Sequence, residues 1–165
     1  MTAHGDPTLD RLFRQEVWVL RKLFAFLRSV PEDVLAMTAP NTGWDVSVLL
    51  THIVSASVTY AARIDGRPDA DLQPPDTHAD LAAMEVEAIA AAERLRELAA
   101  EGSDAEVVEV DGERTWRYPR SLILAQSIYH AIEHRAQLFG VLRSEEHTSE
   151  LQSLAYLVCR LLLEK

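Results

Sequence analysis

With 165 residues, 48% of them hydrophobic, the chain is long enough for one domain with a sizeable core, and its single cysteine excludes an internal disulfide. A formal net charge of −10 without any basic cluster argues against a nucleic-acid partner. The sequence shows no run of about 18 apolar residues and no basic, then apolar leader. We therefore expect neither a membrane span nor secretion, and the predicted location is the cytoplasm.

A first amphipathic helix is predicted from Asp6-Pro7, an N-cap followed by proline at the first helical position, to about Arg28. Glu16 interrupts the apolar stripe of this helix. Its stem can pack at the edge of the stripe while the carboxylate stays in water, which is the interpretation we favour. The alternative is a carboxylate close to a functional site.

The next predicted helix covers Val46 to Ile64, with Asp45 as its N-cap and a turn-rich connection before it. Trp44 is interpreted as a hydrophobic plug at the helix entry. His52 lies beside the apolar stripe of this helix. Such a histidine is commonly a hydrogen-bonded core residue, and the other interpretation is a metal ligand.

A third helix is predicted to begin at Thr77, which forms a capping-box-like pattern with Asp80, and to end at Gly102. His78, in its first turn, is expected to face solvent. After this helix, the alternating segment EVVEVDGERTWRY surrounds Asp111-Gly112, which is a strong β-hairpin signal. Because a lone ribbon is marginal, we expect it to pack on the helices through Val108, Val110 and Trp116.

The last predicted helix, Pro119 to Leu142, carries two histidines one turn apart, His130 and His134. Residues four apart stack on one side of a helix, so both imidazoles can reach one point. Imidazole is a favoured ligand of zinc, nickel and iron, but two histidines do not complete a site. His52 is the candidate third ligand. The apolar stripe expected around them consists of Leu122, Ala125, Ile128, Tyr129, Ile132, Ala136, Phe139 and Leu142.

Residues 143–165 look foreign to the rest of the chain. Read back through the genetic code, RSEEHTSELQS and the later LVCRLLLEK resemble a widely used sequencing adapter in one continuous frame. We therefore expect 143–165 to be a non-native tail and 1–142 to be the native domain. On that interpretation Cys159 and His147 have no functional meaning, and the native sequence beyond Leu142 is missing.

Four amphipathic helices with short and long connections predict an all-α fold, a four-helix bundle with a small β-hairpin insertion before the last native helix. Facing helices of a bundle can share a metal site. Three neutral imidazoles would leave positions open for water or substrate, and a dication there lowers the pKa of bound water or thiol.

Three short segments together resemble the DinB/YfiT-like superfamily: Trp44-Asp45, the LLTH of 49–52, and the HAIEHRAQ of 130–137. The resemblance implies a metal-binding four-helix bundle in which His52, His130 and His134 are the ligands. Glu133 occupies the position where the family often has another histidine. It either orients a ligand or faces solvent, and we favour the solvent-facing interpretation. The R-x-Q of Arg135 and Gln137 implies a supporting or interhelical hydrogen bond.

The resemblance also implies a range of activities. Members of the superfamily include transferases that attach low-molecular-weight thiols such as bacillithiol or mycothiol to electrophiles, related isomerases and metal-dependent hydrolases. The leading hypothesis is a divalent-metal enzyme, using zinc, nickel or iron, that transfers a small thiol to a small electrophile. The alternatives are a metal-dependent hydrolase and a non-catalytic metal-binding stress protein. The family also makes a homodimer an expectation.

Overall fold

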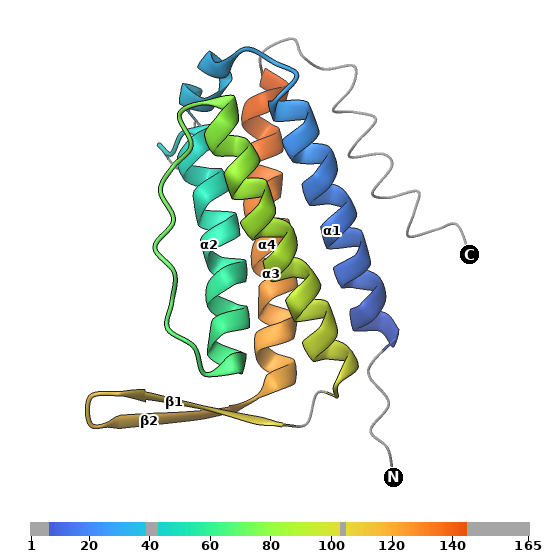
Figure 1. The fold of residues 1–165 in the computed structure, drawn as a ribbon, viewed down its shortest axis with the longest axis vertical. Helices are drawn as coiled ribbons and strands as arrows, with labels where there is room; N and C mark the ends of the chain where they lie inside the picture. The colour runs from blue at the N-terminus through green and yellow to red at the C-terminus, as the bar shows by residue number, and fades with distance from the viewer. Residues whose placement is uncertain (1–6, 39–42, 103–104, 145–165) are drawn as a thin grey trace.

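The computed structural model describes residues 7–38, 43–102 and 105–144 (Figure 1). The predicted all-α bundle with a hairpin before the last helix is confirmed. The predicted N-cap Asp6 and the segment 145–165, with His147 and Cys159, lie outside the described residues, so the domain boundary at Leu142 stays a prediction. In chain order the elements are α1 (Pro7–Leu27), the short 3-10 helix η1 (Glu32–Ala36), α2 (Val46–Asp65), α3 (His78–Ala100), β1 (Glu106–Asp111), β2 (Arg114–Pro119) and α4 (Arg120–Ser144).

The helices run in an up-down-down-up order because one connection crosses the whole bundle. Figure 1 shows the loop between α2 and α3 returning along the length of the bundle, so that these two helices run in the same direction. Prolines at 68, 74 and 75 suit this extended path. As a result α2 and α4, which are far apart in the sequence, pack directly against each other, as do α1 and α3.

Two clusters of buried side chains fill the bundle. The larger cluster draws on all four helices and on η1. The smaller cluster joins Phe13, Ala61, Leu98 and Leu124 at the end of the bundle that carries the hairpin. The largest side chains with less than 2% exposure are Phe13, Phe24, Leu20, Leu23, Leu27, Leu49, Leu50, Ile53, Leu81, Leu95, Leu98 and Leu124.

Helix α2 qualifies as a possible membrane span by length and composition alone, in contrast to the sequence-based expectation of none. The test is weak for one helix, because the core helix of a bundle passes it equally. Here the apolar composition has a local explanation. Helix α2 packs against α3 and α4 and buries Leu49, Leu50, Ile53 and Val54 in the core.

The buried face of α4 differs from the predicted one. Leu122, Tyr129 and Ile132 were expected in the stripe, yet they are 56%, 65% and 51% exposed. Apolar residues occur around most of this helix, so their spacing did not define a single face. The side chains that α4 buries are Ile123, Leu124, Ser127, Ile128, Ala131, Arg135, Leu138, Val141 and Leu142.

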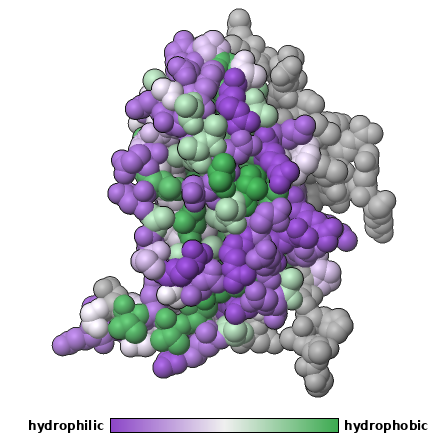
Figure 2. Space-filling model, in the orientation of Figure 1, coloured by the Kyte–Doolittle hydropathy of each residue, from purple (hydrophilic) through white to green (hydrophobic). Residues whose placement is uncertain are grey.

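The hairpin also packs differently from the prediction. Its loop is Gly112-Glu113, with Gly112 at a φ of 57°, and the strands pair Val107 with Tyr118 and Glu109 with Trp116. Paired residues share a face and neighbours in a strand alternate, so Val108 and Val110 cannot lie on the same face as Trp116. Val107 is buried, whereas the other two valines are exposed, and Figure 2 shows hydrophobic surface over the hairpin.

The predicted capping box at the start of α3 is present. The Thr77 hydroxyl accepts from the Asp80 backbone N–H at 3.2 Å, and the Thr77 backbone N–H donates to the Asp80 carboxylate at 3.0 Å. We expect Thr77→Ala to lower the free energy of unfolding by about 1 kcal/mol, because an N-terminal N–H loses its acceptor. Urea denaturation measures this change, and Thr77→Ser, which keeps the hydroxyl, should cost much less. Equal losses in both variants would contradict the role of the cap.

Candidate metal centre

The structure brings the three predicted histidines together where α2 and α4 pack against each other. One ring nitrogen from each of His52, His130 and His134 lies within 4.8 Å of the others. The Nε2 atoms of His52 and His130 are 3.0 Å apart, and all three side chains are half-buried. An ion with bonds of about 2.1 Å separates neighbouring nitrogen ligands by about 3 to 3.5 Å. The group could therefore hold a metal ion with little rearrangement.

A hydrogen bond orients the third histidine. The Nδ1 of His134 lies 2.9 Å from the Oε1 of Gln137, one turn further along α4. An amide oxygen only accepts, so the ring nitrogen donates and the proton resides on Nδ1. In the neutral ring this hydrogen bond selects the tautomer whose Nε2 carries the lone pair that a metal needs.

The surroundings favour neutral imidazoles at this group. Burial, followed by the proximity of His134 and His52, lowers the pKa of His130 to about 4, against a smaller opposing effect of Glu133. Burial, followed by the proximity of His134, also lowers the pKa of His52. Neutral rings have lone pairs available at physiological pH. Glu133 itself is exposed, in line with the interpretation that it faces solvent.

The metal-free protein should lose stability as the pH falls from about 6.5 towards 4. The pKa values of His52 and His130 lie below the ordinary 6.5 in the folded state. The unfolded chain therefore binds more protons in this interval, and acidification favours unfolding. Urea denaturation of the metal-free protein at several pH values measures the effect. In His130→Gln the loss over the same interval should be smaller, and an identical pH profile in both proteins would contradict the assignment.

Trp44, which was interpreted as a hydrophobic plug at the helix entry, lies beside the histidine group. Its ring is 38% exposed, lies 5.0 Å from the His52 ring between centroids, and is nearly parallel to the His134 ring at 6.2 Å. Asp45 caps α2 by accepting from the Val48 backbone N–H at 2.8 Å, which fixes the helix start beside this tryptophan. The Trp-Asp pair directly before the helix of a candidate ligand was the sequence signal for this role.

Glu16 and Arg135 form a buried ion pair between α1 and α4. They are 5% and 8% exposed, so the expectation of a solvated Glu16 carboxylate was wrong. Glu16 does not join the histidine group either, because Arg135 points away from it towards α1. The interhelical interaction expected of Arg135 is thus an ion pair across the core.

His78 lies apart from the histidine group. Its ring Nε2 is 3.0 Å from the Val30 carbonyl oxygen, and its backbone N–H donates to the Glu32 carboxylate at 2.7 Å. The side chain therefore joins the start of α3 to the segment after α1 rather than facing solvent alone. It offers a natural control for substitutions of the candidate ligands.

We expect Gln137→Leu to weaken metal binding about 10- to 100-fold, as for other losses of a hydrogen bond that orients a ligand. The physical reason is that the proton of His134 is no longer held on Nδ1, so the ring can turn or change tautomer. Competition with a chromophoric chelator measures the affinity. Glu133→Gln, at an exposed neighbouring position, should change it far less, and equal effects would contradict the orienting role.

A four-helix bundle that presents three clustered imidazoles from two facing helices belongs to the class of metal-binding bundle proteins. The chain is a member of the DinB family, whose family model matches residues 1–152, and the resemblance seen in the sequence is confirmed. That match ends inside the segment that resembles translated adapter. A comparison with curated proteins found no match.

Proposed function

We propose that this DinB-family protein is a divalent-metal-dependent enzyme that transfers a low-molecular-weight thiol to a small electrophile. His52, His130 and His134 would hold a zinc, nickel or iron ion. When bound, the ion would favour the thiolate form of the thiol and so supply the nucleophile. The observation that carries the proposal is the half-buried group of three imidazoles, which two packed helices bring together.

The donor set supports a thiol in particular. Among the described residues, the candidate ligand group consists of three imidazoles without a carboxylate, so no ligand would carry a negative charge to offset a dication. Such a site favours an anionic small molecule as the additional ligand. The described residues also contain no cysteine, and a thiol substrate brings its own nucleophilic sulfur.

Side chains around the group would position the reactants. The Trp44 ring lies against the rings of His52 and His134 and offers an apolar surface beside them. The Tyr60 ring lies 6.1 Å from the His130 ring, further along α2 towards the hairpin. Gln137 keeps His134 in one tautomer. The chain would thus hold the two reactants close together, which converts a bimolecular reaction into one within a complex.

The test is thiol conjugation by metal-loaded protein. Glutathione, cysteine or bacillithiol is mixed with 1-chloro-2,4-dinitrobenzene, a carbon–sulfur bond forms as the carbon–chlorine bond breaks, and the thiol proton and chloride pass to solvent. We expect a rate well above the uncatalysed one, reduced at least 100-fold in His130→Ala and unchanged in His78→Ala. Turnover that persists in His130→Ala would overturn the proposal, and ester hydrolysis without thiol would point to water as the nucleophile instead.

A further inference from the structure

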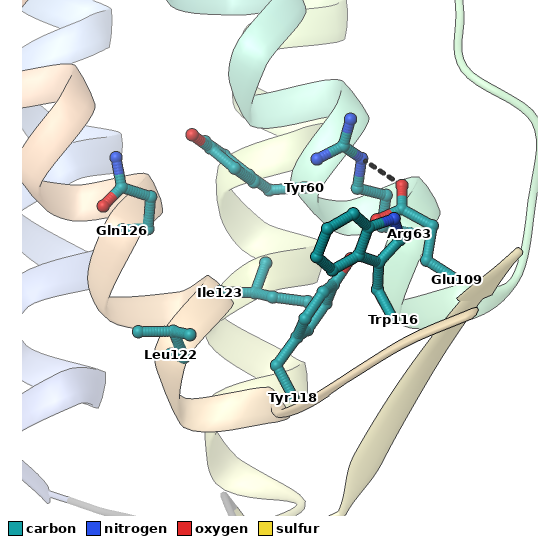
Figure 3. A pocket seen from close by; sticks show the side chains of 8 residues that line it. All are labelled: Tyr60, Arg63, Glu109, Trp116, Tyr118, Leu122, Ile123 and Gln126. Atoms are coloured by element: carbon teal, nitrogen blue, oxygen red, sulfur yellow. Dashed lines mark hydrogen bonds and ion pairs between the residues drawn. The ribbon is translucent and has the colours of Figure 1, made fainter. Parts of the chain in front are cut away.

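A cavity of about 400 Å³ lies between α2, α4 and the hairpin (Figure 3). This volume is within the range of small-molecule sites. Two helices and both strands of the hairpin contribute to it, so the cavity exists only in the assembled fold. Its lining consists of Tyr60 and Arg63 from α2, Glu109 from β1, Trp116 and Tyr118 from β2, and Leu122, Ile123 and Gln126 from α4.

The cavity lies next to the histidine group, and Tyr60 is the residue that links the two. Tyr60 lines the cavity, and its ring is also 6.1 Å from that of His130, edge to face. Gln126 precedes His130 by one helical turn on the facing helix, so both residues lie on the same side of α4. Figure 3 shows Tyr60 and Gln126 on the two facing helices at one side of the cavity, with Trp116 and Tyr118 at the other. A molecule in the cavity would therefore have one end next to the histidines.

The charges that line the cavity compensate each other. Arg63 pairs with Glu109, with 3.2 Å between Nε and Oε1, and the Tyr118 hydroxyl donates to the same carboxylate. That hydrogen bond, followed by burial, raises the pKa of Tyr118, which keeps its hydroxyl protonated as a donor. No unpaired charge remains on these side chains to attract an ion. The cavity thus favours an uncharged ligand.

The shape of the lining indicates a flat ligand. Two aromatic rings from β2 and one from α2 form its walls, with Leu122 and Ile123 opposite. Trp116 and Leu122 are 51% and 56% exposed, so an apolar ligand would remove a large apolar surface from water. Aromatic side chains pack favourably, in stacked or edge-to-face geometry, against an aromatic ligand.

We propose that this cavity binds an uncharged, planar aromatic group, and that this group is the electrophile to which the thiol is transferred. The first half concerns binding alone. The second half rests on the proposed function, which it deepens by naming the class of acceptor. The exposed Trp116 is the main contact, and the hairpin is the element that determines the specificity.

The first experiment measures binding without any reaction. The probe is 1,3-dinitrobenzene, which is flat, uncharged and lacks a leaving group, and its affinity for the full-length protein is measured by calorimetry with and without zinc. We expect Trp116→Ala to weaken binding at least tenfold, because both the aromatic contact and the apolar area that the ligand covers are lost. Val110→Ala is the matched control, since Val110 lies on the opposite face of the same hairpin and is 69% exposed.

A second variant, outside the hairpin, tests whether the effect of Trp116→Ala comes from a disturbed hairpin rather than from the loss of a contact with the probe. Leu122→Asp places a charge in the cavity from α4, at a position exposed enough for the fold to tolerate it. It should also weaken the probe at least tenfold. If neither variant changes the affinity, or if the probe does not bind at all, the inference is overturned.

The second experiment separates this inference from the proposed function. In metal-loaded protein, Trp116→Ala should raise the KM for 1-chloro-2,4-dinitrobenzene several-fold while the KM for the thiol stays constant. Probe binding that depends on Trp116 in a protein without any transferase activity would refute the proposed function and leave the cavity as a binding site. Transferase activity together with unchanged aromatic KM in Trp116→Ala would refute the cavity inference alone.

Discussion

Arg135→Met should lower the free energy of unfolding by about 3–5 kcal/mol, the usual cost of leaving a buried charge without its partner. The Glu16 carboxylate would remain in the core between α1 and α4, where its side chain is 6% exposed. Chemical denaturation at pH 7 measures the change, and a large fraction of the stability of a domain of this size would be lost.

Two further variants identify the cause of that loss. The double variant Glu16→Leu with Arg135→Met replaces both charges by apolar side chains and should regain most of the stability. Arg96→Met removes one of the two arginine partners of Asp10, in a pair whose side chains are 35% and 27% exposed, and it should cost far less than Arg135→Met because water screens this pair. A loss below 1 kcal/mol in Arg135→Met, or a double variant as unstable as the single one, would contradict the burial of this pair.

His130→Ala should abolish stoichiometric metal binding. The wild-type chain should retain about one divalent ion after desalting, as measured by elemental analysis, because three imidazoles meet at one point. With one of the three removed, the remaining two provide an incomplete site. The loss of affinity should exceed the roughly 10- to 100-fold expected for the loss of a supporting hydrogen bond.

Thermal unfolding gives an independent measure of the same site. An excess of metal at about 100 times the Kd stabilises a folded protein by about 2.7 kcal/mol, so zinc should raise the Tm of the wild type and of His78→Ala. His130→Ala should show no such increase. An equal increase in all three proteins would place the ion elsewhere, and His52→Ala provides the same test from α2.

The helices, their caps and the hairpin could be predicted from the sequence because each depends on the spacing of residues within a short segment. Helical spacing of apolar residues located α1 to α4, and the Thr77 and Asp45 caps marked two of the helix starts. The alternation around Gly112 located the hairpin. His130 and His134 were predicted to lie close together because they are one helical turn apart. The prediction that His52 lies near them also required α2 and α4 to face each other.

The remainder depends on contacts that no local pattern records. Glu16 and Arg135 are 119 positions apart, and a single glutamate in an apolar stripe does not identify its partner. The apolar residues around all sides of α4 left its buried face undefined. The two faces of the hairpin, by contrast, could have been predicted from the sequence. Side chains alternate along each strand and paired residues share a face, which places Val108 and Trp116 on opposite faces.

The three candidate ligands come together only after α2 and α4, which the long connection and α3 separate in the sequence, have packed against each other. His52 and His130 are separated by 78 positions in the sequence, so no short fragment of the chain contains all three imidazoles. A peptide equivalent to α4 offers two donors and α2 offers one, so neither can substitute for the assembled domain. Tight metal binding should therefore require the packed tertiary structure. A chain that has formed its helices without packing them should bind no ion tightly, and tight binding should appear only with the last cooperative step of folding.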